Sequence, residues 1–418
     1  MSLGPYGLIR HNNRVGRLTA AVLISSTGDP LTLTVSLVLL YQATRTPLAV
    51  AFAFGTQMLA ALSVGALLGA STDRLDRRRL IVRLEIVRFL LVLSLPLLVG
   101  LSVFLLYPAL FLLGAVEALV LPSRQAAVPH LVGRGEVGAA NALLLTATTL
   151  GQATGFAVAG LALARLGDPR LIYVADALTF AASAGIVASL GSLGGGVTAT
   201  RLRGGVRRAW AVPGVAPLLL VAAATVFVIG MLNTALLPAA YQLSNSGPSA
   251  YTLLELCLIA GAVLGSLVAG RITTRIRLPA LAAALWVFAA GVAGVGLSPN
   301  LWPATLAVAI SGVGNAVYAV TNMSALMDAG SALNRGTIMS ARFTLTQAAK
   351  ALGLGAGGLL TAGLGPRGSF TVFGAGLMAV AMAYAFFLLS RRRASTATPA
   401  LLRPPPAADP PAGRTSTP

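Results

Sequence analysis

The chain has 418 residues, of which 56% are hydrophobic and only 10% are charged. This composition excludes a soluble protein, because the surface of a soluble domain of this size would be far too apolar. The formal net charge of +19 does not indicate a nucleic-acid-binding protein, because the basic residues lie between apolar segments and form no single basic face. The apolar segments are long enough to cross a bilayer as helices. The sequence therefore predicts an all-α polytopic membrane protein.

Twelve such segments can be read along the chain, in two sets of six. The first set lies near residues 17–41, 47–70, 80–101, 103–121, 139–164 and 170–191, and the second near 215–240, 250–270, 279–297, 301–323, 337–363 and 369–390. They divide the chain into an N-terminal six-helix bundle (1–191), a cytoplasmic linker (192–214), a C-terminal six-helix bundle (215–390) and a Pro-rich tail (391–418) expected to be disordered.

Arginine is concentrated in the loops at one end of these predicted helices. We call this end the basic end. Both termini lie there, with the loops around Arg77, Arg124, Arg271 and Arg335. The loops at the other end contain only Arg45, Arg165, Arg170 and Arg367. Cytoplasmic loops carry the excess of Lys and Arg. We therefore expect a multi-pass protein of the plasma membrane with both termini in the cytoplasm.

The segment from Gly65 to Arg79 joins the second and third predicted helices and combines helix-packing glycines with a cluster of charge. It resembles the loop signature of the major facilitator superfamily, Gly-x-x-x-Asp-Arg-x-Gly-Arg-Arg. The residues that match it are Gly69, Asp73, Arg74, Arg77 and Arg78, whereas Asp76 replaces the usual glycine. The resemblance implies a conformational lock at the cytoplasmic face, in which Asp73 caps the start of the eleventh helix. We include Glu117 in this lock as a possible partner of Arg77.

Further motifs refine the resemblance. Four short stretches resemble the branch of the superfamily that contains macrolide-efflux proteins and the enterobactin exporter. They are Gly28-Asp29, residues 122–132, Asn141 and residues 334–340. The fifth helix carries Gly151, Gly155 and Gly160, similar to an antiporter motif but with Phe156 in place of its proline. Ordinary helix packing explains these glycines equally well.

An internal repeat relates the two halves. Gly65-Ala-Leu-Leu-Gly69 recurs as Gly261-Ala-Val-Leu-Gly265, at the same place in the second half, and Ala269 stands where Asp73 stands in the first. Parallel repeats of this kind are found in the superfamily, with the substrate site between the halves. We expect the second joint to lack the acidic lock.

Ionisable residues inside membrane helices are costly and therefore mark candidate functional sites. Asp29, in the middle of the first helix, is the best candidate for proton coupling, with Lys350 as a possible counter-charge; a structural role is the alternative for both. Asp176 and Glu255 are expected to be hydrated near the outer face. The candidates for the substrate cavity are the polar residues Asn233, Asn315, Tyr318 and Asn322.

The resemblance implies a secondary transporter that exports a small amphipathic organic molecule, a drug or siderophore-like compound, in exchange for protons. Uptake or facilitated diffusion by the same fold, and a non-transporting membrane sensor, remain alternatives. We expect a monomer embedded in the lipid bilayer, with no cofactor, no metal and no nucleic-acid partner. Neither a Ser/His/Asp set nor a nucleotide-binding loop is present in the sequence, so an enzyme or an ATP-driven pump is not indicated.

Overall fold

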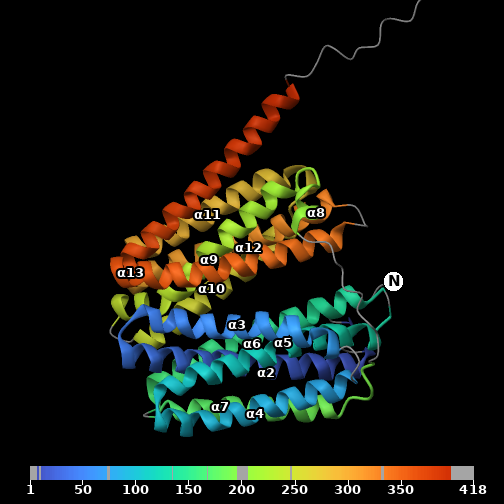
Figure 1. Ribbon diagram of the computed structural model, residues 1–418, viewed down its shortest axis with the longest axis vertical. Helices are drawn as coiled ribbons and strands as arrows, with labels where there is room; N and C mark the ends of the chain where they lie inside the picture. The colour runs from blue at the N-terminus through green and yellow to red at the C-terminus, as the bar shows by residue number, and fades with distance from the viewer. Residues whose placement is uncertain are drawn as a thin grey trace, which may run out of the picture.

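The computed structural model describes residues 7–8, 11–72, 76–133, 135–166, 168–194, 206–244, 247–330 and 334–396, with the side chains of 64–72, 206 and 391–396 excepted. The described chain is almost wholly helical and its helices form two groups (Figure 1). The blue-to-green group holds the first half of the chain and the yellow-to-red group the second (Figure 1).

The first group consists of six long helices. They are α2 (Asn13–Thr44), α3 (Pro47–Thr72), α4 (Arg77–Leu101), α5 (Leu106–Ala127), α6 (Val137–Arg165) and α7 (Arg170–Ala188), with single 3-10 turns at Val103–Leu105 and Val128–His130. Helix α2 packs against α6 and α7, α3 packs against α5, and α4 packs against both α7 and α5. These contacts connect the six helices in the order α3, α5, α4, α7, α2 and α6.

A short helix in the linker, α8 (Val206–Trp210), precedes the second group. The helices of this group are α9 (Val215–Leu243), α10 (Gly247–Ala269), α11 (Arg277–Leu297), α12 (Leu301–Ala329) and α13 (Arg335–Thr396), with a 3-10 turn at Thr274–Ile276. Helix α13 is broken at Gly365, whose φ of 72° is readily adopted only by glycine. The break falls between the two segments predicted at 337–363 and 369–390, and the helix continues past Arg391, where the sequence predicted its end.

The all-helical membrane fold is confirmed. Among the described residues, ten helices are long and apolar enough to cross a membrane, counting α13 once across its break. Helix α3 is 26 residues long and is not among these ten. Only its part Pro47–Ser63 has described side chains, and that part forms a shorter apolar helix. The predicted helix limits agree with the observed ones to within a few residues, except that α5 and α12 extend about six residues further toward the basic end.

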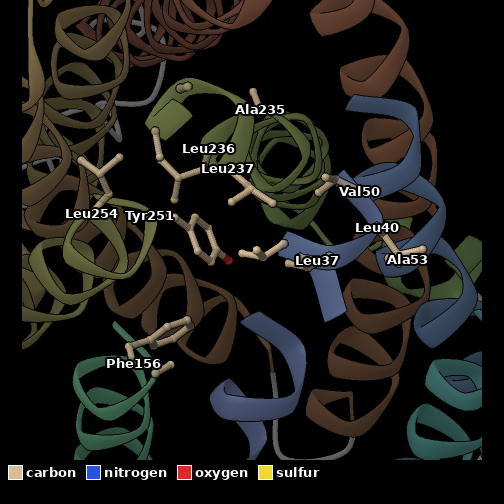
Figure 2. Packing of buried hydrophobic residues seen from close by; sticks show 14 of the residues in the cluster. Leu37, Leu40, Val50, Ala53, Phe156, Ala235, Leu236, Leu237, Tyr251 and Leu254 are labelled. Carbon is tan, nitrogen blue, oxygen red and sulfur yellow. The ribbon is translucent and has the colours of Figure 1, made fainter. Parts of the chain in front are cut away.

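The hydrophobic core shows where the two halves meet. One cluster is shared by both halves and takes its residues from the parts of the helices far from the basic end, including Leu37, Val50, Phe156, Leu237 and Tyr251 (Figure 2). Two other clusters lie toward the basic end, and each belongs to a single half. The halves therefore share a core at the end opposite the arginine-rich loops and have separate cores at the basic end.

Specific contacts repeat this pattern. Gln42 donates a hydrogen bond to the Tyr241 hydroxyl at 3.0 Å, and the rings of Tyr41 and Tyr241 lie 5.1 Å apart. Phe156 meets Tyr251 edge-on at 6.4 Å between ring centroids. Within the described part of the chain, all hydrogen bonds and ring contacts given between the halves lie at this end. The conformation is closed at the end opposite the basic end.

Candidate functional site

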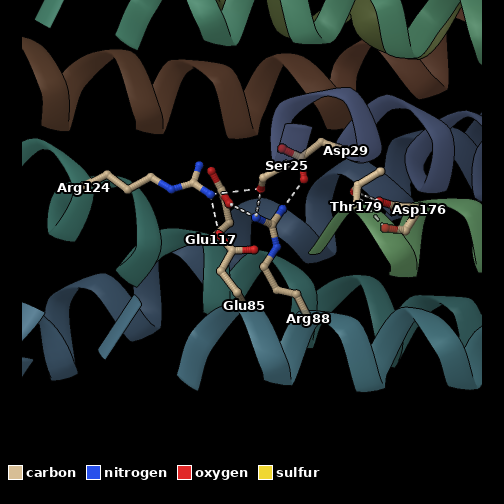
Figure 3. A network of polar contacts seen from close by, with 8 residues as sticks. All are labelled: Ser25, Asp29, Glu85, Arg88, Glu117, Arg124, Asp176 and Thr179. Atoms are coloured by element: carbon tan, nitrogen blue, oxygen red, sulfur yellow. Dashed lines mark hydrogen bonds and ion pairs between the residues drawn. The ribbon is translucent and has the colours of Figure 1, made fainter. Parts of the chain in front are cut away.

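Arg88 is the centre of a buried charge network in the first half (Figure 3). It lies on α4, and its guanidinium group forms an ion pair with Asp29 of α2 and a second one with Glu117 of α5 at 3.2 Å. The same group lies over the Phe180 ring, 4.1 Å from its centroid. Arg88 thus joins four helices, because Phe180 belongs to α7.

A second ion pair extends the network. Arg124 of α5 pairs with Glu85 of α4, and both arginines donate to the Ser25 hydroxyl, at 3.3 Å from Arg88 and 2.9 Å from Arg124. The side chains of Glu85, Arg88 and Arg124 are 0%, 5% and 7% exposed, whereas those of Asp29 and Glu117 are 35% and 42% exposed. The two accessible carboxylates therefore share one buried arginine.

Asp176 of α7 lies beside this network. Its carboxylate accepts a hydrogen bond from Thr179 at 3.2 Å and is fully buried, which corrects the expectation that it is hydrated. The close approach requires Gly28, because a Cβ at that position would collide with the side chains of Asp176 and Thr179. Asp29, Arg88 and Asp176 line a cavity of about 130 Å³. A cavity of this size with polar walls can hold water.

The network carries more acids than bases. Asp29, Glu85, Glu117 and Asp176 face two guanidinium groups, so the fully ionised set has a formal charge of −2. Uncompensated charge is costly away from water. The set is therefore chemically suited to take up protons or a cationic ligand. No group of three or more His, Cys, Asp or Glu side chains that could hold a metal ion occurs among the described residues.

Sequence reasoning found only part of this network. It identified Asp29, Glu117 and Asp176, but it overlooked Glu85 and Arg88 and assigned Arg124 to a loop. The missed signal was a glutamate and an arginine three residues apart in an otherwise apolar segment, since that spacing puts them on one helix face.

The expected partners also differ. The counter-charge of Asp29 is Arg88 and not Lys350, for which no ion pair or hydrogen bond is given among the described residues. Glu117 pairs with Arg88 and not with Arg77. Both partners differ for one reason, because the Arg88 side chain extends from the neighbouring helix α4 into the space between α2 and α5.

The predicted lock lies mostly outside the described residues. Asp73 and Arg74 belong to the undescribed segment 73–75, and Gly69 lies in the part of α3 whose side chains are not described. Arg77 contacts the His130 ring nitrogen at 2.6 Å, and Arg78 donates to the carbonyl oxygens of Ala188 and Leu190. Both arginines therefore bind parts of their own half in this conformation.

Asp76, which departs from the family signature, has a clear role. It is the N-cap of α4, where its carboxylate accepts a hydrogen bond from the Arg79 backbone N–H at 2.9 Å and one from the Ser192 hydroxyl at 3.3 Å. The backbone hydrogen bond lowers the pKa of Asp76 below its ordinary value. An acid is favourable here because three arginines begin the helix, where the helix dipole opposes positive charge.

The predicted packing glycines lie at close helix contacts. Gly151 and Gly155 of α6 face the α2 backbone near Leu23 and Thr27, and Gly160 faces Thr252 of α10 in the other half. The repeat glycines Gly261 and Gly265 of α10 face the α12 backbone at Ala309 and Val313. A side chain at these positions would collide with backbone atoms, except at Gly160, where it would meet the Thr252 side chain.

The predicted cavity residues of the second half separate into two pairs. Asn233 of α9 and Asn315 of α12 line a cavity of about 60 Å³ together with Glu255 of α10. Tyr318 and Asn322 do not line it: Tyr318 packs in the core near the basic end, and Asn322 donates to the Leu218 carbonyl oxygen at 3.1 Å. Both lie on the buried face of α12, and the Asn322 amide joins that helix to α9.

The helices and the buried charges define an integral membrane transporter that crosses the bilayer several times. The family model described as transmembrane secretion effector matches residues 11–412. The chain therefore belongs to this family of the major facilitator superfamily, and it is a transporter rather than an enzyme. No curated protein sequence matches it.

Solved structures support the same fold. A mutant of the nucleoside transporter NupG has a TM-score of 0.73 at 11% identity, over 89% of this chain and 99% of that one. A bacterial homologue of the iron transporter ferroportin, in an inward-facing state, has a TM-score of 0.72 at 16% identity, over 89% and 98%. A bacterial homologue of the human lysosomal transporter Spinster, inward-facing and occupied, has a TM-score of 0.69 at 16% identity, over 90% and 96%. At these identities the likeness concerns the fold alone.

Proposed function

We propose that the protein exports a small amphipathic organic molecule from the cytoplasm in exchange for protons. We further propose twelve membrane helices in two six-helix bundles, over residues 1–191 and 215–390, which requires α3 to span the membrane and α13 to count as two helices. The basic end would face the cytoplasm of a plasma-membrane protein, with both termini inside. The family description, a secretion effector, supports the outward direction.

The observation that carries the proposal is the sharing of Arg88 by Asp29 and Glu117. Both carboxylates are accessible, while the arginine is buried and fixed against Phe180. If either acid took up a proton, its ion pair with Arg88 would weaken and Arg88 would pair with the other acid. Protonation would therefore decide whether Arg88 of α4 is paired to α2 or to α5. The other charged groups near Asp29 are Asp176 and Arg124. The network therefore offers a link between protonation and helix arrangement.

A transport cycle follows from this link. With the halves closed at the far end, the described conformation would admit substrate from the cytoplasm. In the opposite conformation Asp29 would take a proton from outside as substrate leaves. Return to the first conformation would bring the proton to the cytoplasm, where proton activity is lower, and Asp29 would pair with Arg88 again.

The opposite conformation requires closure at the basic end. We propose that Asp73, with Arg74 and Arg77, provides it by capping the start of α13 at Arg335. The described conformation supports this indirectly, because the cores at the basic end are separate and Arg77 is engaged within its own half. Asp73→Asn should reduce transport strongly while leaving expression near normal.

Proteoliposomes with a trapped pH dye test the function. A panel of neutral and cationic amphipathic compounds is added to vesicles that hold the full-length protein under an imposed pH difference. We expect proton movement and accumulation for a subset of compounds. Asp29→Asn should still exchange those compounds but no longer concentrate them, whereas Asp168→Asn, at an exposed turn, should behave as the unmodified protein. Full pH-driven accumulation by Asp29→Asn would show that coupling lies elsewhere.

A further inference from the structure

Glu255 differs from Asp29, Glu85 and Glu117, the three acids of the first-half network that form ion pairs. It lies on α10, within the cavity of about 60 Å³ in the second half, and no ion pair to it is given among the described residues. Tyr251 stands one helical turn earlier on the same helix. A lone carboxylate in an apolar surrounding is stabilised by a proton or by a positive charge from elsewhere.

The cavity offers further acceptors around this charge. Asn233 and Asn315 reach it from α9 and α12, and the described residues show no hydrogen bond to either side-chain amide. Their amide oxygens can accept hydrogen bonds from a ligand. Ser311 also lines the cavity, although its hydroxyl donates to the Val308 carbonyl oxygen at 2.7 Å. The polar part of the cavity thus consists of one anion and neutral acceptors.

The remaining walls are apolar and partly aromatic. Phe288 of α11 and Phe370 of α13 face the same space, together with Leu, Ile and Val side chains. An inorganic cation such as Mg²⁺ or Ca²⁺ prefers six or more oxygen ligands, which this cavity lacks. An organic ammonium group is a better match, because its N–H groups can meet the carboxylate and amides while its carbon atoms contact the aromatic rings.

We propose that the Glu255 cavity binds the protonated amine of an amphipathic ligand, so that amphipathic amines are preferred over neutral amphipathic compounds as substrates; their export in exchange for protons rests on the proposed function. Glu255 is the charge partner, Asn233 and Asn315 accept hydrogen bonds, and Phe288 and Phe370 enclose the adjoining carbon atoms. The small volume suits the amine end of the ligand, with its apolar body extending toward the space between the halves.

Tyr251 connects this site to the closed end. It lies one helical turn from Glu255 on α10, and its ring meets Phe156 of the first half edge-on. An amine bound at Glu255 therefore lies one helical turn from a side chain that helps to hold the two halves together.

A matched pair of fluorescent probes tests the proposal. Binding of 1-naphthylmethylamine and of its neutral counterpart 1-naphthalenemethanol is measured on the purified full-length protein in lipid nanodiscs. We expect the amine to bind about tenfold more tightly than the alcohol, as a charge-assisted hydrogen bond implies. Glu255→Gln should remove this preference without changing alcohol binding, Glu255→Asp should retain part of it, and Asp168→Asn should retain all of it. Thermal unfolding verifies that each variant is folded.

Transport by the same variants separates this inference from the proposed function. Glu255→Gln should keep pH-driven accumulation of neutral compounds, and Asp29→Asn should keep the amine preference. An equal affinity of the unmodified protein for both probes, or an unchanged preference in Glu255→Gln, would overturn the inference. So would loss of pH-driven accumulation of neutral compounds in Glu255→Gln, because Glu255 would then carry the proton. Amine binding at Glu255 without proton movement would instead overturn the proposed function alone.

Discussion

The two halves of this transporter differ in how they hold the carboxylates that face their cavities. In the first half, Asp29, Glu85 and Glu117 are each paired with an arginine supplied by the same half. In the second half, Glu255 faces apolar side chains and amides and has no such arginine among the described residues. Paired acids can exchange partners when a proton arrives, whereas an unpaired acid is suited to receive a cation from outside the protein.

The largest expected effect is the loss of Arg88. Arg88→Gln leaves two carboxylates without their shared partner, and breaking a buried ion pair typically costs about 3–5 kcal/mol. We expect a large fall in folded yield and melting temperature, measured by size-exclusion chromatography and thermal unfolding in detergent. Arg88→Lys should recover part of the loss, since it keeps the charge but not the planar group.

Glu255→Gln is the counterpart in the second half. Since no buried cation depends on Glu255, we expect its melting temperature to stay equal to that of the unmodified protein or to rise. If Arg88→Gln and Glu255→Gln were equally destabilising, the contrast between paired and unpaired acids would be wrong.

The next effect concerns helix packing, which the two halves are expected to share. Gly151→Val and Gly265→Val each insert a side chain against a neighbouring helix, at α2 and at α12. Overpacking of this kind costs about 1–3 kcal/mol, so both melting temperatures should fall by similar amounts. Gly185→Ala provides the control, because a Cβ at that position meets nothing within 4 Å. Unequal losses would show that the close glycine contacts of the two halves tolerate a side chain differently.

A smaller effect is expected where the halves join. Tyr241→Phe removes the hydroxyl that accepts from Gln42 but keeps the ring against Tyr41. A hydrogen bond of this kind contributes about 0.5–1.5 kcal/mol, so the population closed at this end should fall by several-fold. Distances between spin labels placed on the two halves would report the shift. Tyr107→Phe is a matched control within one half, since its hydroxyl contacts only the Ala49 carbonyl oxygen at 3.4 Å.

The smallest effect belongs to Asp76. Its pKa is lowered in the folded protein, so its ionised form stabilises the fold above the ordinary value of 3.8, and this contribution is lost as the pH falls through the lower folded-state pKa. At neutral pH, Asp76→Ala should cost about 1 kcal/mol, as expected for an N-cap. Asp76→Asn should cost less, and melting temperatures measured down to pH 3 should converge for the native residue and asparagine.

The sequence was sufficient to predict an all-helical membrane protein because long apolar segments and arginine-rich loops are local signals. Asp29 could be identified for the same reason, as a single acid in an apolar helix. Arg88 could not, because it follows the basic residues Arg77–Arg83 and resembles the end of a loop cluster. Its pairing with Asp29 depends on how α4 packs between α5 and α7, which no local pattern contains. Tyr318 and Asn322 show the reverse error, since a polar residue on a membrane helix does not reveal which neighbour it faces.

The turns at the closed end have a practical consequence. There α2 and α3 are separated only by residues 45–46, α11 and α12 only by 298–300, and the two parts of α13 by the single break at Gly365. Proteases and antibodies need exposed backbone that can leave the surface. A tag or fusion partner inserted at these turns would strain both adjoining helices. Reagents for detection or purification should therefore be directed to the basic end.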